Sequence, residues 1–291
     1  MDRSTITGIA AGIILILLAI AFEGGIAAFF SFSSLVIVLG GVTAATLVNY
    51  NIDDIVNAQH AVQVAFRSEQ IEMLPHIEMF TIFSRRARRN GLLILDDDVR
   101  YIEDPYLRNG LELAIDGISE ENLKNILHEE IESLKKRHDQ SIRMLQSMAT
   151  YAPAFGMIGT LIGLILMLGN LDESGDIGAG LSIALITTLY GTIFANLIFA
   201  PLSGKLEELS VKEINEKEML KTAIISLSNG ENPRILEKKM LTYVTPENRK
   251  EYARMYGDRG YSKQQEEKLY SHWLNQQKDK WENTLTDLQA G

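Results

Sequence analysis

Oxygen-bearing groups in two apolar segments are the part of this chain best suited to chemistry. They belong to three threonines and one proline: Pro153, Thr160, Thr187 and Thr188. Hydroxyl and carbonyl oxygens are ligands that a hard cation such as sodium accepts in place of water. Pro153 has no N–H, so it leaves a backbone carbonyl one turn earlier free to contact an ion or a bound water. The alternative is helix packing, because threonine hydroxyls often donate hydrogen bonds to their own helix.

Small residues accompany these hydroxyls at helical spacing. The set is Gly156, Gly159, Gly163, Ala184, Gly191 and Ala195. Residues four apart lie on one face of a helix, and small residues there let another backbone approach closely. An ion path through a membrane normally needs an ionisable group, and these apolar segments contain none. We therefore expect a partner protein to supply a carboxylate on a helix that packs against this small-residue face.

Charges of both signs cluster between residues 84 and 98. Four arginines at one helix end precede three aspartates: Arg85, Arg86, Arg88, Arg89, Asp96, Asp97 and Asp98. Such a surface suits a transient electrostatic contact with a protein that binds, slips and rebinds. The alternatives are an internal network of ion pairs, a solvated face and a contact with acidic lipid.

The sequence contains no pattern typical of an enzyme. Its histidines lack the HExxH spacing of zinc enzymes, and the chain has no cysteine. The GxSxG, phosphate-binding-loop and GxGxxG motifs are also missing. We therefore expect no catalysis, no cofactor and no tightly bound metal. The net charge of −10 argues against nucleic acid as the main partner.

Four apolar blocks place the hydroxyls and small residues in a membrane. The blocks are Ile6–Phe22, Ile26–Val48, Met148–Leu168 and Gly178–Leu202. Each lacks Lys, Arg, Asp and Glu, and each is about long enough to cross a hydrocarbon core of ~30 Å. A buried core helix is the alternative for the first and shortest block. A cleaved signal peptide is rejected, because Phe22–Glu23–Gly24 is no small-x-small cleavage site.

The positions of Lys and Arg set the expected orientation. Apart from Arg3, all of these residues lie between residues 49 and 147 or after residue 202. Positive charge stays cytoplasmic, so both termini and the large loop are expected in the cytoplasm. The connectors Glu23–Gly25 and Leu171–Ile177 carry acids and no bases, so they are expected on the other side.

The predicted fold is an all-α integral membrane protein with four transmembrane helices and a helical cytoplasmic domain. Its parts are a transmembrane hairpin (1–49), a cytoplasmic helical domain (50–147), a second hairpin (148–202), a cytoplasmic helical extension (203–245) and a polar C-terminal tail (246–291). Helices are expected over Ile52–Phe66 and Ile71–Asn90, from Pro105 to about Asp116, and from Ser119 into the third span. Pro201 is an expected hinge before the helix Lys205–Ser228, and Asn232–Pro233 begins a last short helix. No structure is expected in the tail.

Five motifs occur in order along this topology. They read RRNGLLILDD (88–97), NGL with DG (109–111, 116–117), YAPAFGMIGTLIGL (151–164), TTLYG (187–191) and GENPR (230–234). Across roughly residues 1–245 the chain resembles the MotA/PomA stator subunits of the bacterial flagellar motor. The resemblance implies five copies around two copies of a MotB/PomB-type partner in the bacterial cytoplasmic (inner) membrane. The partner's single span would supply an ion-binding aspartate, and ion flow would turn the ring and push the rotor protein FliG.

The same resemblance implies roles for individual residues. Arg88, Arg89, Asp96 and Asp97 align with rotor contacts, whereas Pro153, Thr160, Thr187 and Thr188 align with residues near the ion. The hydroxyls look like those of the sodium-type branch, so transported Na+ is favoured over H+. Some sodium-type members have an acid near the start of span two, where this chain has Ser31. The alternative is an ExbB/TolQ-like, gliding or defence-type energiser of an envelope partner; ExbB/TolQ subunits are expected to have three spans and an external amino terminus.

Overall fold

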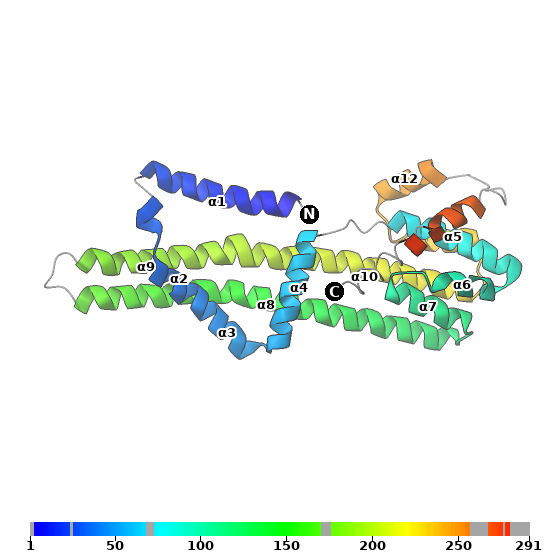
Figure 1. The fold of residues 1–291 in the computed structure, drawn as a ribbon, viewed down its shortest axis with the longest axis horizontal. Helices are drawn as coiled ribbons and strands as arrows, with labels where there is room; N and C mark the ends of the chain where they lie inside the picture. The colour runs from blue at the N-terminus through cyan, green and yellow to red at the C-terminus, as the bar shows by residue number, and fades with distance from the viewer. Residues whose placement is uncertain are drawn as a thin grey trace. The chain divides into compact units, whose positions relative to one another are not determined.

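The computed structural model describes residues 3–23, 26–67, 73–169, 176–256, 267–275 and 277–279, and every regular element in them is helical (Figure 1). The described residues form two compact units. The first combines residues 1–69 with 136–210 and is called the apolar unit here; the second combines 70–135 with 211–291 and is called the polar unit. The predicted connectors Glu23–Gly25 and Leu171–Ile177 lie largely outside the described residues.

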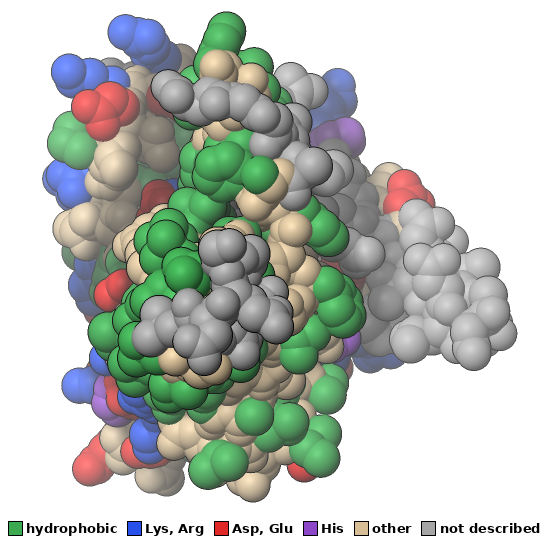
Figure 2. Space-filling model, turned by 90° about the vertical axis from the view of Figure 1, so that its left-hand side faces the viewer, with side chains coloured by type: hydrophobic (Ala, Val, Ile, Leu, Met, Phe, Trp, Pro, Cys, Tyr) green, Lys and Arg blue, Asp and Glu red, His purple; other side chains and the backbone are tan. Residues whose placement is uncertain are grey.

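The apolar unit consists of long apolar helices and their connections. Its elements are α1 (Arg3–Glu23), the 3-10 turn η1 (Ile26–Phe29), α2 (Phe32–Leu35), the π-helical turn η2 (Val36–Gly40), α3 (Gly41–Asn49), α4 (Ile52–Arg67), the second half of α8 (Glu120–Gly169), α9 (Asp176–Ile193), the π-helical turn η4 (Phe194–Phe199) and the start of α10 (Ala200–Ser228). Figure 1 shows α8 and α9 side by side. Figure 2 shows hydrophobic side chains gathered around the ends of these two helices.

Three helices among the described residues are long and apolar enough to cross a membrane. They are Phe32–Asn49, Glu120–Gly169 and Ile177–Ser228. The apolar part of α1 is shorter and covers Ala10–Phe22, so the fourth predicted span remains a prediction. Hydrophobic side chains such as Leu161, Ile165 and Leu185 are 60–68% exposed, as expected where lipid or another protein covers a transmembrane helix.

The second predicted span begins later than its hydropathy indicates. The apolar block Ile26–Val48 was expected to contain the second span, and within it α2 begins only at Phe32, after η1 and the extended residue Ser31. The Ser31 hydroxyl oxygen accepts hydrogen bonds from the backbone N–H and the hydroxyl of Ser34. Serine in this position satisfies the free N–H groups at a helix start, so the local cap breaks the apolar block.

The two prolines in the second hairpin do not interrupt their helices. α8 continues through Pro153 for 50 residues, as predicted. The helix Ile177–Ser228 also continues through Pro201, and η4 ends just before it. Proline removes one helical hydrogen bond, and a wider π-type turn is one way for a helix to accommodate such a change. The hinge role of Pro201 stays a prediction.

The polar unit packs short helices around the first part of α8, up to residue 135, and the part of α10 from residue 211 onward. Its further elements are α5 (Met73–Asn90), the 3-10 turn η3 (Leu92–Leu95), α6 (Asp96–Val99), α7 (Pro105–Ile115), α11 (Pro233–Leu241) and α12 (Pro246–Tyr256). The core of this unit includes the fully buried apolar side chains Phe80, Phe83, Leu111, Leu127, Leu220 and Ile224. Burying each such side chain contributes about 1.5–3 kcal/mol.

Local turn chemistry explains the boundaries of these helices. Gly91, Gly117 and Gly230 have φ values of 85°, 76° and 63°, a left-handed conformation that favours glycine after a helix end. The Asp104 carboxylate accepts hydrogen bonds from the backbone N–H groups of Tyr106 and Leu107 at the start of α7. The predicted helix ends at Asn90 and Ser228 are therefore confirmed.

The polar tail has more structure than its composition predicted. α12 buries Tyr252, and the helical residues 267–275, called the tail segment here, bury Tyr270. The Trp273 ring centre lies 5.2 Å from that of Phe83 in an edge-to-face contact. The prediction of an unstructured tail is wrong for these residues, because aromatic side chains anchor them to the core.

Candidate functional site

Glycine residues form the crossing between α8 and α9. A Cβ atom added to Gly159 would lie 2.5 Å from the Thr187 Oγ1, and one added to Gly163 would lie 2.5 Å from the Gly180 carbonyl oxygen. On α9, a Cβ at Gly191 would lie 2.6 Å from the Ala152 carbonyl oxygen. These separations are shorter than ordinary van der Waals contact. The two helices therefore meet backbone to backbone, which is the packing that small residues allow.

The chain itself fills the face that was expected to receive a partner's helix. The predicted packing residues Gly156, Gly159, Gly163, Ala184 and Gly191 all lie in the α8–α9 contact. Ala195 lies instead in a hydrophobic cluster of the apolar unit with Val42, Ala152 and Phe199. The second helix of the same hairpin therefore occupies the face that these residues share, and their predicted packing against a partner's helix stays a prediction.

The three predicted threonines are not equivalent. Thr187 is fully buried, and its hydroxyl donates to the carbonyls of Ile183 and Ala184. Thr160 is half-buried and donates to the Met157 carbonyl at 2.6 Å, and the exposed Thr188 donates to the Ala184 carbonyl at 3.2 Å. Threonine hydroxyls often bond back to their own helix in this way, so the packing alternative describes Thr187 fully.

Thr160 and Thr188 keep an additional capacity. A hydroxyl that donates its proton still has two oxygen lone pairs. Because these two side chains are not fully buried, their oxygens remain open to a group from outside the described chain. Both border the place where Gly156 lies against the backbone of Thr188, since Thr160 follows Gly156 by four residues on the same face of α8. This pair is the best candidate in the apolar unit for contact with a cation.

Two backbone features lie near the same hairpin. Pro153 cannot donate a helical hydrogen bond, so it leaves the carbonyl of Ala149 without the bond that another residue would supply.

The Tyr190 hydroxyl donates to the Phe29 carbonyl at 2.8 Å and accepts from the Ser31 N–H at 3.2 Å. Tyr190 thus connects α9 to the break before α2. In the sequence, Tyr190 is visible only as a member of the TTLYG motif.

The charged cluster of the polar unit divides into two groups. Arg88, Arg89, Asp96 and Asp97 are exposed, whereas Arg85, Arg86 and Asp98 are partly buried. Arg100, which was not predicted, approaches Asp97 at 2.8 Å and Asp96 at 4.0 Å. Exposed ion pairs of this kind contribute only about 0–1 kcal/mol, so the aspartates can exchange Arg100 for another cation at little cost.

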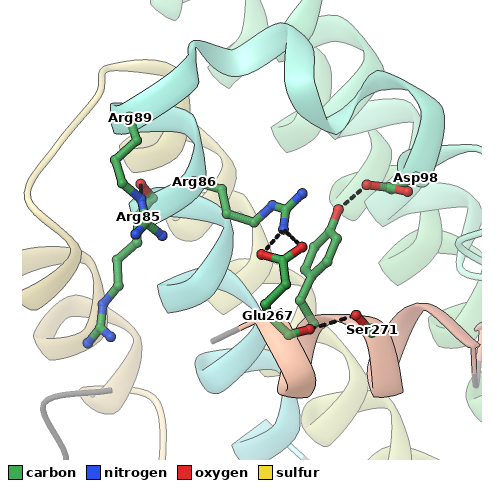
Figure 3. A network of polar contacts seen from close by, with 7 residues as sticks. Arg85, Arg86, Arg89, Asp98, Glu267 and Ser271 are labelled. Carbon is green, nitrogen blue, oxygen red and sulfur yellow. Dashed lines mark hydrogen bonds and ion pairs between the residues drawn. The ribbon is translucent and has the colours of Figure 1, made fainter. Parts of the chain in front are cut away.

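The partly buried members of the cluster contact the tail segment. Figure 3 shows the Arg86 side chain directed toward Glu267, and one guanidinium nitrogen lies 3.1 Å from both carboxylate oxygens. The Arg86 guanidinium carbon also lies 3.7 Å from the centre of the Tyr270 ring. The Tyr270 hydroxyl donates a hydrogen bond to Asp98. The tail segment therefore contacts one arginine and one aspartate of the predicted surface.

The environment of Tyr270 keeps its hydroxyl protonated. Burial, together with the hydrogen bond to Asp98, raises the pKa of Tyr270 well above its ordinary value of 10.0. The phenol is therefore a stable donor to the Asp98 carboxylate at neutral pH. This contact was not predicted, and the available signal was the three-residue spacing of Tyr270 and Trp273, which places them on one helix face. Among the described residues, no group of three or more His, Asp or Glu side chains could hold a metal ion.

Comparison with known proteins identifies the family. Residues 98–219 match the family model described as the MotA/TolQ/ExbB proton channel family. The chain is 38% identical over 249 residues to the uncharacterized protein YtxD of Bacillus subtilis, covering 84% of this chain and 92% of that protein. It is 36% identical over 250 residues to Motility protein A of Borreliella burgdorferi, covering 86% of this chain and 96% of that protein. A chain of the solved flagellar MotAB stator complex from Bacillus subtilis has a fold similar to this one. The comparison gives a TM-score of 0.81 and 28% sequence identity and covers 87% of this chain and all of that chain. With this agreement in sequence and fold, the chain belongs to the MotA/PomA family within the MotA/TolQ/ExbB proton channel proteins.

Proposed function

We propose that this chain is a flagellar stator subunit that forms a cation channel with a MotB/PomB-type partner. One observation carries the proposal: the predicted membrane-spanning parts of α8 and α9 hold hydroxyl groups but no Asp, Glu, Lys, Arg or His. An ion path through a membrane needs such a group, so a second protein supplies the carboxylate. The match to a chain of the flagellar MotAB stator complex supports a partner of this kind.

The ion site forms where the partner's aspartate meets Thr160 and Thr188. Their hydroxyl oxygens replace part of the cation's hydration shell, and the carbonyl freed by Pro153 offers a further oxygen nearby. Neutral oxygen ligands favour sodium over a proton as the transported ion. A sodium ion needs several oxygen ligands, whereas a proton binds to the carboxylate alone. Thr187 supports the site by fixing the distance between α8 and α9.

Ion flow turns a ring of five copies around two partner chains. One charge that crosses the membrane supplies about 2.3 kcal/mol per 100 mV, which is enough to bias a small rotation step. The chain lies in the bacterial inner membrane with four spans and both termini in the cytoplasm. The exposed residues Arg88, Arg89, Asp96 and Asp97 offer charges of both signs to the rotor protein FliG.

The proposed function is tested by measuring swimming speed in a strain that depends on this chain and its cognate partner. The external sodium concentration is varied at fixed pH. We expect speed to rise with sodium and to saturate. Thr160→Ala and Thr188→Ala should abolish this dependence, while co-purification shows that the complex still assembles. A speed that follows the proton gradient and ignores sodium would refute the ion assignment. Unchanged motility in both variants would refute the threonine site.

A further inference from the structure

The contact between the tail segment and α5 is complementary in chemistry and in spacing. Glu267, Tyr270 and Trp273 follow one another at three-residue intervals, so they share a helix face. Phe83 and Arg86 have the same spacing on α5. The carboxylate of Glu267 meets the Arg86 guanidinium, and the Trp273 ring meets the Phe83 ring edge to face.

The contact is built so that it can open without unfolding the core. Glu267 is 67% exposed, and an ion pair with one partner in solvent is weak. Within residues 267–275, Tyr270 is buried and Leu269, Trp273 and Leu274 are only partly buried against the core, whereas α11 buries Leu236 and Met240 completely in the same unit. Elements with few buried apolar contacts open locally at low free energy. The tail segment is therefore held more weakly than the helices beneath it.

The covered residues belong to the charged cluster between residues 84 and 98, whose exposed members the proposed function assigns to the rotor. Arg86 and Asp98 are both engaged by the tail segment, while Arg88, Arg89, Asp96 and Asp97 remain exposed. A subunit in this state offers only part of its charged surface to a partner. Because the tail segment is on the same chain, even a weak contact is populated, since its effective concentration is high.

We propose that residues 267–275 are a built-in competitor of the rotor protein for the Phe83–Arg86–Asp98 face of the polar unit. The face binds a helix that carries a carboxylate and aromatic rings at three-residue spacing, and the tail segment is its occupant until the rotor protein displaces it. This inference rests on the proposed stator function, and it adds that each subunit controls its own access to the rotor.

The test measures rotor-protein binding to the complete stator complex with four versions of this chain. The versions are the full chain, a chain that ends at Tyr256, Glu267→Gln and Lys268→Gln. Lys268 is exposed and adjacent to Glu267, so it is a control of matched size and position. We expect about tenfold tighter binding by the shortened chain if the tail segment is bound nine-tenths of the time. Glu267→Gln should bind about two- to fivefold more tightly, and Lys268→Gln should bind like the full chain.

Hydrogen exchange on the full-length complex gives an independent measurement. Addition of the rotor protein should increase exchange in residues 267–275 and decrease it in residues 85–98. Equal affinity of all four versions, with the tail segment still protected in the bound state, would overturn the competition but leave the stator function standing. Failure of every version to bind the rotor protein would overturn the rotor contact itself and the competition with it.

Discussion

Gly180→Ala should separate α8 from α9, whereas Gly178→Ala two residues earlier in the same helix should not. A Cβ at position 180 would lie 2.6 Å from the Gly163 carbonyl oxygen and 2.8 Å from the Met167 backbone nitrogen. A Cβ at position 178 would have no neighbour within 4 Å. The atoms that block position 180 belong to the backbone, so no side chain can rotate away to make room.

The expected cost follows from the distance by which the helices must separate. Ordinary contact begins at 3.4 Å, so the crossing must widen locally by about 0.8 Å, and gaps of that size forfeit a quarter to a half of each dispersion contact. Overpacking of this kind costs about 1–3 kcal/mol. The thermal unfolding midpoint of the purified complex, followed by circular dichroism, should fall by about 2–10 °C for Gly180→Ala.

The control defines the outcome that refutes this reasoning. Gly178→Ala should leave the midpoint unchanged or raise it slightly, because alanine has the higher helix propensity. If the two variants have the same midpoint, the α8–α9 contact does not depend on close backbone approach. The small-residue face would then be available to a partner's helix after all.

Three further predictions address the hydroxyls, the charged surface and the tail. Thr187→Ala should lower the thermal unfolding midpoint, because it removes a buried methyl group and a buried hydroxyl. Thr188→Ala should leave the midpoint unchanged and abolish sodium-driven swimming. If only Thr188→Ala lowers the midpoint, the two roles are reversed. Arg89→Glu or Asp97→Lys should slow rotation of tethered cells without changing sodium uptake, and reduced uptake with normal rotation would contradict the rotor contact. The raised pKa of Tyr270 means that the folded state favours the neutral phenol, so this side chain contributes stability below about pH 10 that declines as the pH rises further. The stability difference between the wild type and Tyr270→Phe should therefore narrow above that pH, and a constant difference would argue against the buried, hydrogen-bonded environment of the Tyr270 hydroxyl.

Helix boundaries in the polar unit were predictable because local chemistry decides them. Gly91 and Gly230 take left-handed conformations that follow a helix end, and the Asp104 carboxylate caps the next helix together with Pro105. Each signal lies within a few residues of the boundary it sets. The continuation of α8 through Pro153 was also predictable, because apolar residues recur on both sides without a cap or a turn.

The predictions failed where a single residue set a helix start that the mean hydropathy of the segment does not indicate. They also failed where two residues in contact are far apart in the sequence. The hydropathy of residues 26–48 indicates a single span, but the Ser31 hydroxyl caps a helix start within it. The glycines of α8 correctly indicated a close backbone approach, yet spacing alone does not say which helix approaches. Trp273 contacts Phe83, and no local pattern connects two residues so far apart in the chain.

The central claim is that this chain supplies neutral oxygens and that a second protein supplies the acid. Uptake of radioactive sodium into proteoliposomes tests it most directly, with the chain alone compared with the chain and its single-span partner. We expect uptake only when both proteins are present, and loss of that uptake when the partner's membrane aspartate is replaced by asparagine. Sodium uptake by this chain alone would contradict the account.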